Sequence, residues 1–480
     1  MKEGKKIIVW FRNDLRLHDH QPLNEALSRA TQVIPVFCFD PRYFRLTKFG
    51  TEKTGIFRAR FLIESVSALR ENLRSKGADL LVLCGKPEDV LIQVAIDYGV
   101  SHVLAYKEVA SEEIKIADLV EEKLWKNHIP LDLFLGNTLF NKEDLPFPIK
   151  DIPNNFAQFK KRVERDSHVR KSFEEPQSIP CVPLIDCGVM PDLNSFGYQD
   201  FSKDDRAVLD FKGGEQEGLK RLNEYVWEKE LIKTYKHTRN KLLGADYSSK
   251  LSPWLSLGCL SPRKVYEEIK SFENDRVSNG STQELFHELL WRDYFRFLFK
   301  KFGNTMFRLE GLKNKSPESN LLTENDLYTK WKDGKTGIPF IDANMRELLA
   351  TGFMSNKGRQ VVSSFLIYDC KVRWTLGAAW FEECLIDYNP ASNWGSWSYI
   401  AGVSGDAKET LSLHILKQAY DNDSKGEYVK LWIPELQNLP SYLVQQPYLM
   451  TLEQQALYGI TIGNNYPSPV VELKKFEKQY

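Results

Sequence analysis

The first 135 residues alternate short apolar runs with amphipathic stretches, and this alternation limits the possible fold more than any other feature of the chain. The pattern is typical of β-α-β units, in which helices cover a parallel sheet. We therefore expect a doubly wound parallel-sheet α/β domain over residues 1–135. The apolar runs predict strands at 7–11, 33–39, 80–84, 103–106 and 131–135, and the amphipathic stretches predict helices at 57–73, 87–98 and 112–125.

Prolines change the pattern after this region. Seven of them lie between residues 136 and 205, and each interrupts regular backbone hydrogen bonding. We interpret 136–205 as an interdomain connector. From 206 to 480 a 3.6-residue apolar period predicts an all-helical domain, with helical stretches at 215–240, 282–302, 338–349 and 357–370.

Composition excludes several classes of protein. A length of 480 residues favours two domains, and a formal net charge of +0 means that any nucleic-acid binding must use a local basic patch. The seven cysteines form no CxxC pair, so we expect reduced thiols, no disulfide framework and no metal site. No run approaches the ~18 apolar residues of a membrane helix, and MKEGKK leads directly into an apolar run. We expect no membrane association, no signal peptide and a cytoplasmic location.

Residues 387–399, DYNPASNWGSWSY, concentrate a carboxylate, amides and tryptophans in a short segment. Buried amides and carboxylates cost free energy unless they are hydrogen-bonded, and a planar polar ligand would supply partners. On a helix Asn393 and Trp397 lie four residues apart and share a face, which suits a heteroaromatic ring. The segment predicts a buried cofactor.

Hydroxyl groups precede a proline at Ser248, Ser249 and Ser252, with Pro253 suited to the first turn of a helix. Such hydroxyls, together with free backbone N–H groups, make a seat for an anion such as a diphosphate. The alternative is an ordinary helix cap.

Glu288, Trp291 and Arg292 follow i, i+3, i+4 spacing, so an acid, an indole and a guanidinium share one helical face. Arg296 and Lys300 continue this face, which would form a basic stripe for phosphates. The alternative is a solvated, salt-bridged face.

Asn356, Arg359 and Gln360 repeat this spacing after a glycine-containing loop. Arg359 is expected to pair with Asp387. The alternative is a glycine-bounded loop with a capping Asn.

Three tryptophans, Trp374, Trp380 and Trp397, lie in the same helical region as these polar groups. Aromatic residues at helical spacing usually bury large apolar area in a core. A redox cofactor would make them electron relays instead.

Several long motifs in a fixed order resemble the photolyase/cryptochrome family, and more narrowly its cryptochrome DASH branch. The resemblance runs from residue 10 to about residue 440. It is carried by WFRNDLR at 10–16, KTGIFR at 53–58, KTGIP at 335–339, FMSN at 353–356 and SNWG at 392–395.

This resemblance implies that the helical domain is an FAD-binding domain. It assigns Asn356 to flavin N5, pairs Arg359 with Asp387 beside the ring, and makes Asn393 part of the same wall. Trp397 and Trp374 match the first two members of an electron-transfer chain. The phosphates and ribityl region would be held by Tyr235, Ser248, Ser249, Leu251, Ser252 and Arg292.

The resemblance also implies a blue-light-driven DNA repair enzyme, a deoxyribodipyrimidine photolyase. Glu288 would hydrogen-bond a cyclobutane pyrimidine dimer and Trp291 would stack on the flipped lesion. Gln360 and Tyr399 stand where duplex-specific photolyases have Met and Trp, so single-stranded DNA is the expected substrate; Lys357 completes the substrate-facing set. The alternative is a blue-light photoreceptor that signals through DNA, RNA or protein partners. A nucleotide-binding protein without light chemistry is a third interpretation.

A second pigment is implied as well, because the DASH branch commonly carries methenyltetrahydrofolate as an antenna between its domains. Glu108 is its candidate contact, with an exposed loop glutamate as the alternative. We expect a monomer.

The chain departs from the family pattern at two places. Asn389 replaces a second aspartate near the flavin, which removes a negative charge and should raise the flavin reduction potential. The distal tryptophan, expected near Leu321, is missing, since 303–330 contains none. Trp380 is our preferred terminal donor, ahead of Trp331 and Tyr328.

Overall fold

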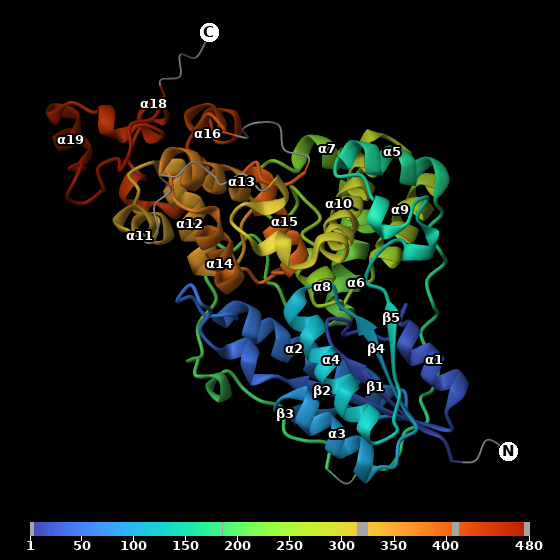
Figure 1. Cartoon of the computed structure of the whole chain (residues 1–480). Helices are drawn as coiled ribbons and strands as arrows, with labels where there is room; N and C mark the ends of the chain where they lie inside the picture. The colour runs from blue at the N-terminus through green and yellow to red at the C-terminus, as the bar shows by residue number, and fades with distance from the viewer. Residues whose placement is uncertain (1–3, 185, 314–324, 406–411, 475–480) are drawn as a thin grey trace.

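The computed structural model describes residues 4–184, 186–313, 325–405 and 412–474, and it divides them into a sheet-containing half and a helical half (Figure 1). Five strands form one parallel sheet in the order β3-β2-β1-β4-β5. All five predicted strands are confirmed. They are β1 (Lys6–Phe11), β2 (Gln32–Phe39), β3 (Leu81–Cys84), β4 (His102–Lys107) and β5 (Leu131–Leu135).

The sheet is covered on both faces, because side chains alternate across each strand. Ile8 and Trp10 of β1 pack in a core with α3 (Pro87–Asp97) and α4 (Ser111–Lys126). Ile7, Val9 and Phe11 point to the opposite face, into a core continuous with the helical half. That face carries α1 (Gln21–Arg29), which the sequence did not predict, and α2 (Ile56–Ser75). The expectation of a doubly wound domain is confirmed.

The connector is mostly irregular but holds one helix that the sequence did not predict, α5 (Phe156–Asp166). Phe156, Phe159 and Val163 bury one face of α5, whereas Lys161 and Arg162 are exposed. The helix packs against α10 (Gly280–Phe302). The connector therefore contributes to the helical half as well as joining the halves.

The second half is helical, and its described part contains no strand beyond an isolated bridge, so the predicted class is confirmed. One expected helix is wrong: 215–240 is broken by a π-turn at Glu224–Glu228 and by Glu230 at a positive φ of 49°. Besides α10, the helices are α6 (Glu215–Asn223), α7 (Tyr235–Thr238), α8 (Ser252–Ser256), α9 (Pro262–Asp275), α11 (Asp326–Lys332), α12 (Pro339–Thr351), α13 (Asn356–Ser364), α14 (Trp374–Cys384), α15 (Pro390–Ile400), α16 (Ile415–Asn422), α17 (Glu427–Trp432), α18 (Ser441–Val444) and α19 (Leu452–Tyr458).

Buried polar contacts fix the two halves against each other. Arg16 donates to the carbonyl oxygen of Gly258 at 2.8 Å, and Asp19 pairs with Arg263 at the start of α9. Glu108 after β4 forms an ion pair with Arg296 of α10 at 3.1 Å, with both side chains almost fully buried. The halves therefore meet through specific charged and polar pairs as well as through apolar packing.

Screening of the described residues finds no helix long and apolar enough to cross a bilayer. The same residues hold no cluster of three or more His, Cys, Asp or Glu side chains arranged for a metal ion. All seven cysteines are free thiols.

Candidate functional site

A cavity of about 570 Å³ opens in the helical half, between α7, α8, α10, α13 and α15. It brings together segments that are up to 178 positions apart in the chain, from Tyr235 to Leu413. Every residue that the sequence analysis assigned to the cofactor lines this cavity: Tyr235, Ser248, Ser249, Leu251, Ser252, Arg292, Asn356, Arg359, Asp387, Asn389 and Asn393.

One wall holds the expected pair between Arg359 and Asp387. The Nη2 atom of Arg359 lies 2.9 Å from Oδ2 of Asp387, and Nε of Arg359 donates to the carbonyl oxygen of Met354 at 2.9 Å. The other carboxylate oxygen, Oδ1 of Asp387, is buried and has no hydrogen-bond partner among the described residues. Its lone pairs are available to an N–H donor of a bound ring.

The same wall uses the amides of α15. Asn389 caps the helix, since its Oδ1 accepts from the backbone N–H of Ser392 at 3.3 Å. Asn393 donates through Nδ2 to the carbonyl oxygen of Ala378 at 2.9 Å, which joins α15 to α14. These contacts fix the wall without the help of a ligand.

The lining also contains a cation that sequence reasoning missed. Lys250 is only 3% exposed and has a positive φ of 55°. Its Nζ lies 3.2 Å from the centroid of the Tyr247 ring and has no hydrogen-bond partner among the described residues. Burial and the nearby Arg221 guanidinium lower the pKa of Lys250 to about 7. Arg221 itself holds the turn by donating to the carbonyl oxygens of Ser248 and Ser249. The serines flanking Lys250 drew attention to this segment, but nothing in its sequence indicated that the lysine side chain is buried.

Arg292 also lines the cavity, deep in the interface between the halves. Its guanidinium donates to the carbonyl oxygens of Asn137 and Leu255. Burial and Arg296 lower its pKa to about 9. Arg292 therefore links the cavity wall to the connector.

The expected acid and indole, Glu288 and Trp291, line one part of the cavity together with Gln360 and Tyr399, and we call this part the mouth. Glu288 forms an ion pair with Arg239, a residue that sequence reasoning missed because it lies 49 positions away. Trp291 stacks on Phe156 of α5, with ring centroids 3.6 Å apart, and meets Tyr399 edge to face. Gln360 and Tyr399 line the mouth, whereas Lys357 lies outside the cavity lining and is half-buried.

The predicted basic stripe on α10 is wrong. Arg296 is 3% exposed and is held by Glu108, because helix α10 turns this part of its surface towards the first half. Glu108 is consequently a buried interface residue and not an exposed loop glutamate. It does not line either of the two large cavities described here.

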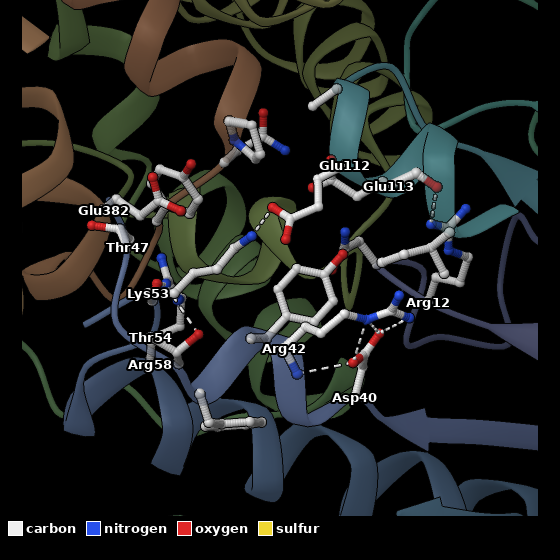
Figure 2. A pocket seen from close by; sticks show the side chains of 18 of the residues that line it. Arg12, Asp40, Arg42, Thr47, Lys53, Thr54, Arg58, Glu112, Glu113 and Glu382 are labelled. Atoms are coloured by element: carbon white, nitrogen blue, oxygen red, sulfur yellow. Dashed lines mark hydrogen bonds and ion pairs between the residues drawn. The ribbon is translucent and has the colours of Figure 1, made fainter. Parts of the chain in front are cut away.

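A second cavity, of about 770 Å³, lies between the two halves (Figure 2). Charged side chains of both signs surround it: Arg42 bonds Asp40, Lys53 pairs with Glu112, and Arg12 donates to the backbone of Glu113. Burial raises the pKa of both Glu113 and Glu382. Sequence reasoning did not find this cavity, because its wall combines residues 10–62, 87, 110–116, 256–257, 304–308 and 382–394.

Family comparisons match both halves of the chain. Residues 7–180 match the family model described as DNA photolyase, and residues 285–480 match the FAD binding domain of DNA photolyase. A Gloeobacter violaceus protein named Cryptochrome DASH is 48% identical over 469 residues, covering 98% of this chain and 93% of that protein. The chain is a member of the cryptochrome DASH branch of the photolyase/cryptochrome family.

Two further comparisons agree with this assignment. The crystal structure of a Synechocystis sp. PCC6803 cryptochrome has a TM-score of 0.93 and 44% identity, with 98% of each chain covered. An Arabidopsis thaliana relative named Cryptochrome DASH, chloroplastic/mitochondrial, is 46% identical, covering 92% of this chain and 77% of that protein. The predicted family and fold are confirmed, whereas the cytoplasmic location stays a prediction, since the name of this relative refers to chloroplasts and mitochondria.

The first cavity of this cryptochrome DASH protein fits the cofactor of an FAD-binding domain. An FAD molecule offers ring N–H and carbonyl groups at one end and a diphosphate in the middle. The unpartnered Oδ1 of Asp387 suits a ring N–H, and the unpartnered Nζ of Lys250 suits an anion. The buried polar groups of the cavity thus match the two chemically distinct parts of FAD.

The tryptophans of this cryptochrome DASH protein lie beside the first cavity. Trp397 lines it, and its ring lies against the α14 backbone at Gly377, where a Cβ would collide with the indole. Trp374 starts α14 one turn earlier, and its Nε1 donates to the carbonyl oxygen of Leu309 at 3.0 Å. Trp380 is partly exposed near the other end of α14. The family position of the distal tryptophan, Leu321, lies outside the described residues.

Another aromatic path leaves Trp397 in a different direction. Trp331 meets Trp397 edge to face with ring centroids 6.3 Å apart, and Tyr328 stacks near Trp331 at 6.1 Å. The Nζ of Lys332 lies 4.9 Å from the centroid of the Tyr328 ring and 5.0 Å from that of Trp380. One cation therefore neighbours both candidate terminal donors.

Proposed function

We propose that this cryptochrome DASH protein is a blue-light-driven photolyase that repairs cyclobutane pyrimidine dimers, preferentially in single-stranded DNA. The observation that carries the proposal is one continuous cavity, with Glu288 and Trp291 at its mouth and the Arg359–Asp387 pair in its wall. Residues suited to a lesion and residues suited to the cofactor thus line the same cavity.

The chain's own residues bind and orient the reactants. Trp291, held from behind by Phe156, offers an indole surface on which a flipped base stacks. Glu288 hydrogen-bonds a carbonyl of the dimer, and the Arg359–Asp387 pair and Asn393 hold the ring of the cofactor. FAD, when bound, reduced and excited by light, supplies one electron to the dimer and recovers it after the two C–C bonds of the cyclobutane ring have opened.

The preference for single-stranded over duplex DNA is supported by two residues at the mouth of the cavity. Gln360 and Tyr399 give the mouth polar groups, and Tyr399 presents a smaller ring than an indole. Flipping bases from a duplex costs a few kcal/mol, which such a mouth offsets poorly. A single strand does not carry this cost.

Illumination of the photoreduced holoprotein with dimer-containing oligonucleotides tests the proposal. Loss of the lesion from single strands, with little loss from duplexes, is the expected result. Glu288→Ala should bind flavin normally and repair much more slowly, since it removes the group that hydrogen-bonds the dimer. No repair of either substrate by a flavin-loaded, photoreducible protein would move the function to a photoreceptor, for which binding of undamaged DNA or RNA is the next measurement.

We propose the second cavity as the site of the antenna, with methenyltetrahydrofolate as the pigment. Its mixed charges suit a ligand with a polar heterocycle and an anionic tail, and its wall shares Ser256, Tyr388 and Asn389 with the first cavity. Adding the folate to purified protein should produce a near-ultraviolet absorption band that also appears in the action spectrum of flavin photoreduction. A band that is absent from the action spectrum would contradict an antenna role.

A further inference from the structure

Arg239, just after α7, lies between two acids of α10. Its Nη1 forms an ion pair with Oε1 of Glu288, and its Nη2 lies 2.9 Å from Oε1 of Glu284. Glu284 and Glu288 are one helical turn apart, so one guanidinium spans both carboxylates. Arg239 and Glu288 line the first cavity, whereas Glu284 does not.

The groups around Glu288 shift its pKa in opposite directions. Burial is the largest influence and raises the pKa of Glu288, and the charge of Glu284 acts in the same direction. Arg239 opposes both by its charge and its hydrogen bond, with a smaller contribution from His287. Tyr235 also faces Glu288, and Lys357 of α13 is the further cation near Arg239. Arg239 is thus the main group that opposes this rise in the pKa of Glu288 and favours its ionised form.

An ionised Glu288 cannot play the role given to it above. A carboxylate only accepts hydrogen bonds, and so does a pyrimidine carbonyl, so one of them must carry a proton for a bond to form. While Arg239 is paired with Glu288 as a carboxylate, Glu288 cannot donate a hydrogen bond to a carbonyl of the dimer.

A nucleic-acid strand brings a group that competes for Arg239. Each phosphodiester carries a negative charge, and the planar guanidinium bonds phosphate oxygens in pairs. The side chain of Arg239 is 28% exposed at the cavity mouth, where a strand carrying a flipped lesion must pass. The Arg239 side chain is therefore partly accessible to a strand phosphate.

We propose that Arg239 is a switch operated by the substrate: it holds Glu288 as a carboxylate in the free protein and moves to a strand phosphate on binding, so that Glu288 takes up a proton and donates to the dimer. The inference rests on the proposed repair function. Its proton balance is explicit: Glu288 gains one proton from solvent for each strand bound, and no electron is transferred in this step. Arg239 is thereby a positioning residue that acts through Glu288.

Proton uptake on binding tests the switch directly, in the dark and without catalysis. Calorimetric titration of the holoprotein with a dimer-containing single strand, in buffers of different ionisation enthalpy, should give close to one proton taken up per strand at neutral pH. By linkage, the dissociation constant should then rise about tenfold per pH unit above neutrality, because deprotonated Glu288 must be reprotonated for binding. An enthalpy that does not depend on the buffer would overturn the switch.

Three variants separate the switch from a structural role. Arg239→Gln should bind the strand more weakly and take up less than one proton, because it removes the main group that favours the ionised form of Glu288 in the free protein, and Glu288→Gln should take up none. Glu284→Gln is the matched control: it removes the other partner of Arg239 and should retain the uptake. Full proton uptake by Glu288→Gln would assign the proton to another group and reject the proposal.

The proton-uptake test of the switch and the illumination test of the repair function can fail independently. Repair of dimers by a protein that takes up no proton would refute the switch and leave the photolyase intact. Failure to repair at all would refute the function from which the switch follows.

Discussion

At the scale of single residues, the most informative atoms are the buried polar ones without a partner. Lys250 and Asp387 both line the first cavity, and each carries one such atom. Leaving charged groups in this state costs free energy in the ligand-free protein, and a ligand that satisfies them recovers it. These two residues are therefore good positions at which to test cofactor binding.

Lys250→Met should weaken FAD binding by about tenfold or more, the loss expected for a hydrogen bond to a charged group. An anionic partner raises the pKa of Lys250 from its ligand-free value of about 7, so the binding contribution is full below pH 7 and falls as the pH rises further. Flavin fluorescence during titration of the apoprotein measures this affinity at several pH values. Lys241→Met, at an exposed lysine nearby, is the control; equal pH dependence in the wild type and Lys250→Met would contradict the assignment.

Asn389→Asp should lower the reduction potential of the bound flavin, because it adds a negative charge to the wall of the cavity. The capping bond to Ser392 should survive, since Asp accepts it as well as Asn does. Spectroelectrochemical titration gives the potential, and Asn389→Ser keeps a cap without adding charge. An unchanged potential in the Asp variant would show that residue 389 does not tune the flavin.

Sequence spacing predicted those residues of the site that lie on the same helix or that pair with a residue close by in the chain. Asn393 and Trp397 share α15, and Arg359 pairs with Asp387 across 28 positions. Arg239 and Lys250 were missed for a different reason. Their importance comes from burial and from partners on other helices, and neither is encoded in local spacing.

At the scale of elements, α14 and α15 determine by which route an electron can reach the flavin from the protein surface. Trp380→Phe should slow photoreduction of the flavin under blue light with an external reductant, since it removes the expected terminal donor. Lys332→Met should accelerate it, because the ammonium group 5.0 Å from the Trp380 ring disfavours a positive charge there. Bleaching of the visible flavin band gives both rates. If Tyr328→Phe slows bleaching and Trp380→Phe does not, the electron reaches the flavin through Trp331 instead.

Element boundaries were predictable where amphipathic periodicity ran without interruption. The five strands and α2, α3, α4, α10 and α12 lie within a few residues of their expected positions. The stretch 215–240 has the same periodicity but contains a π-turn, which a 3.6-residue pattern does not reveal. The helix α5 was not predicted, because the seven prolines of 136–205 favoured an irregular connector over its whole length.

At the scale of the whole molecule, the two halves depend on each other through buried charges. Glu108→Gln leaves Arg296 uncompensated and should destabilise the protein by about 3 kcal/mol, the lower range for breaking a buried pair. Thermal unfolding measures the loss. Glu112→Gln breaks a pair with Lys53 in which the Glu112 side chain is 45% exposed, and it should cost less, about 1 kcal/mol.

The same pair of variants tests the first assignment of Glu108 to the antenna. Folded Glu108→Gln should bind the folate as the wild type does, because Glu108 does not line the second cavity. Glu112 does line it, so Glu112→Gln should weaken the folate band. The reverse order of effects would return Glu108 to the antenna site.

The two-half organisation followed from the sequence, but the space between the halves did not. The second cavity requires β1 and β2, the loop at 40–54, and α15 to meet, and these segments are separated by more than 300 positions. A pattern read along the chain identifies each wall as ordinary strand, loop or helix. The cavity exists only after the halves dock.

Ser256, Tyr388 and Asn389 face both cavities, and this shared wall has a thermodynamic consequence. If one occupant changes the free energy of these three side chains, it changes the affinity of the other occupant, and the effect is equal in both directions. Two pigments held this way constitute a heterotropic pair. A preparation that loses its folate during purification would then also hold its flavin with a different affinity, and the ratio of the two affinities measures the strength of the coupling.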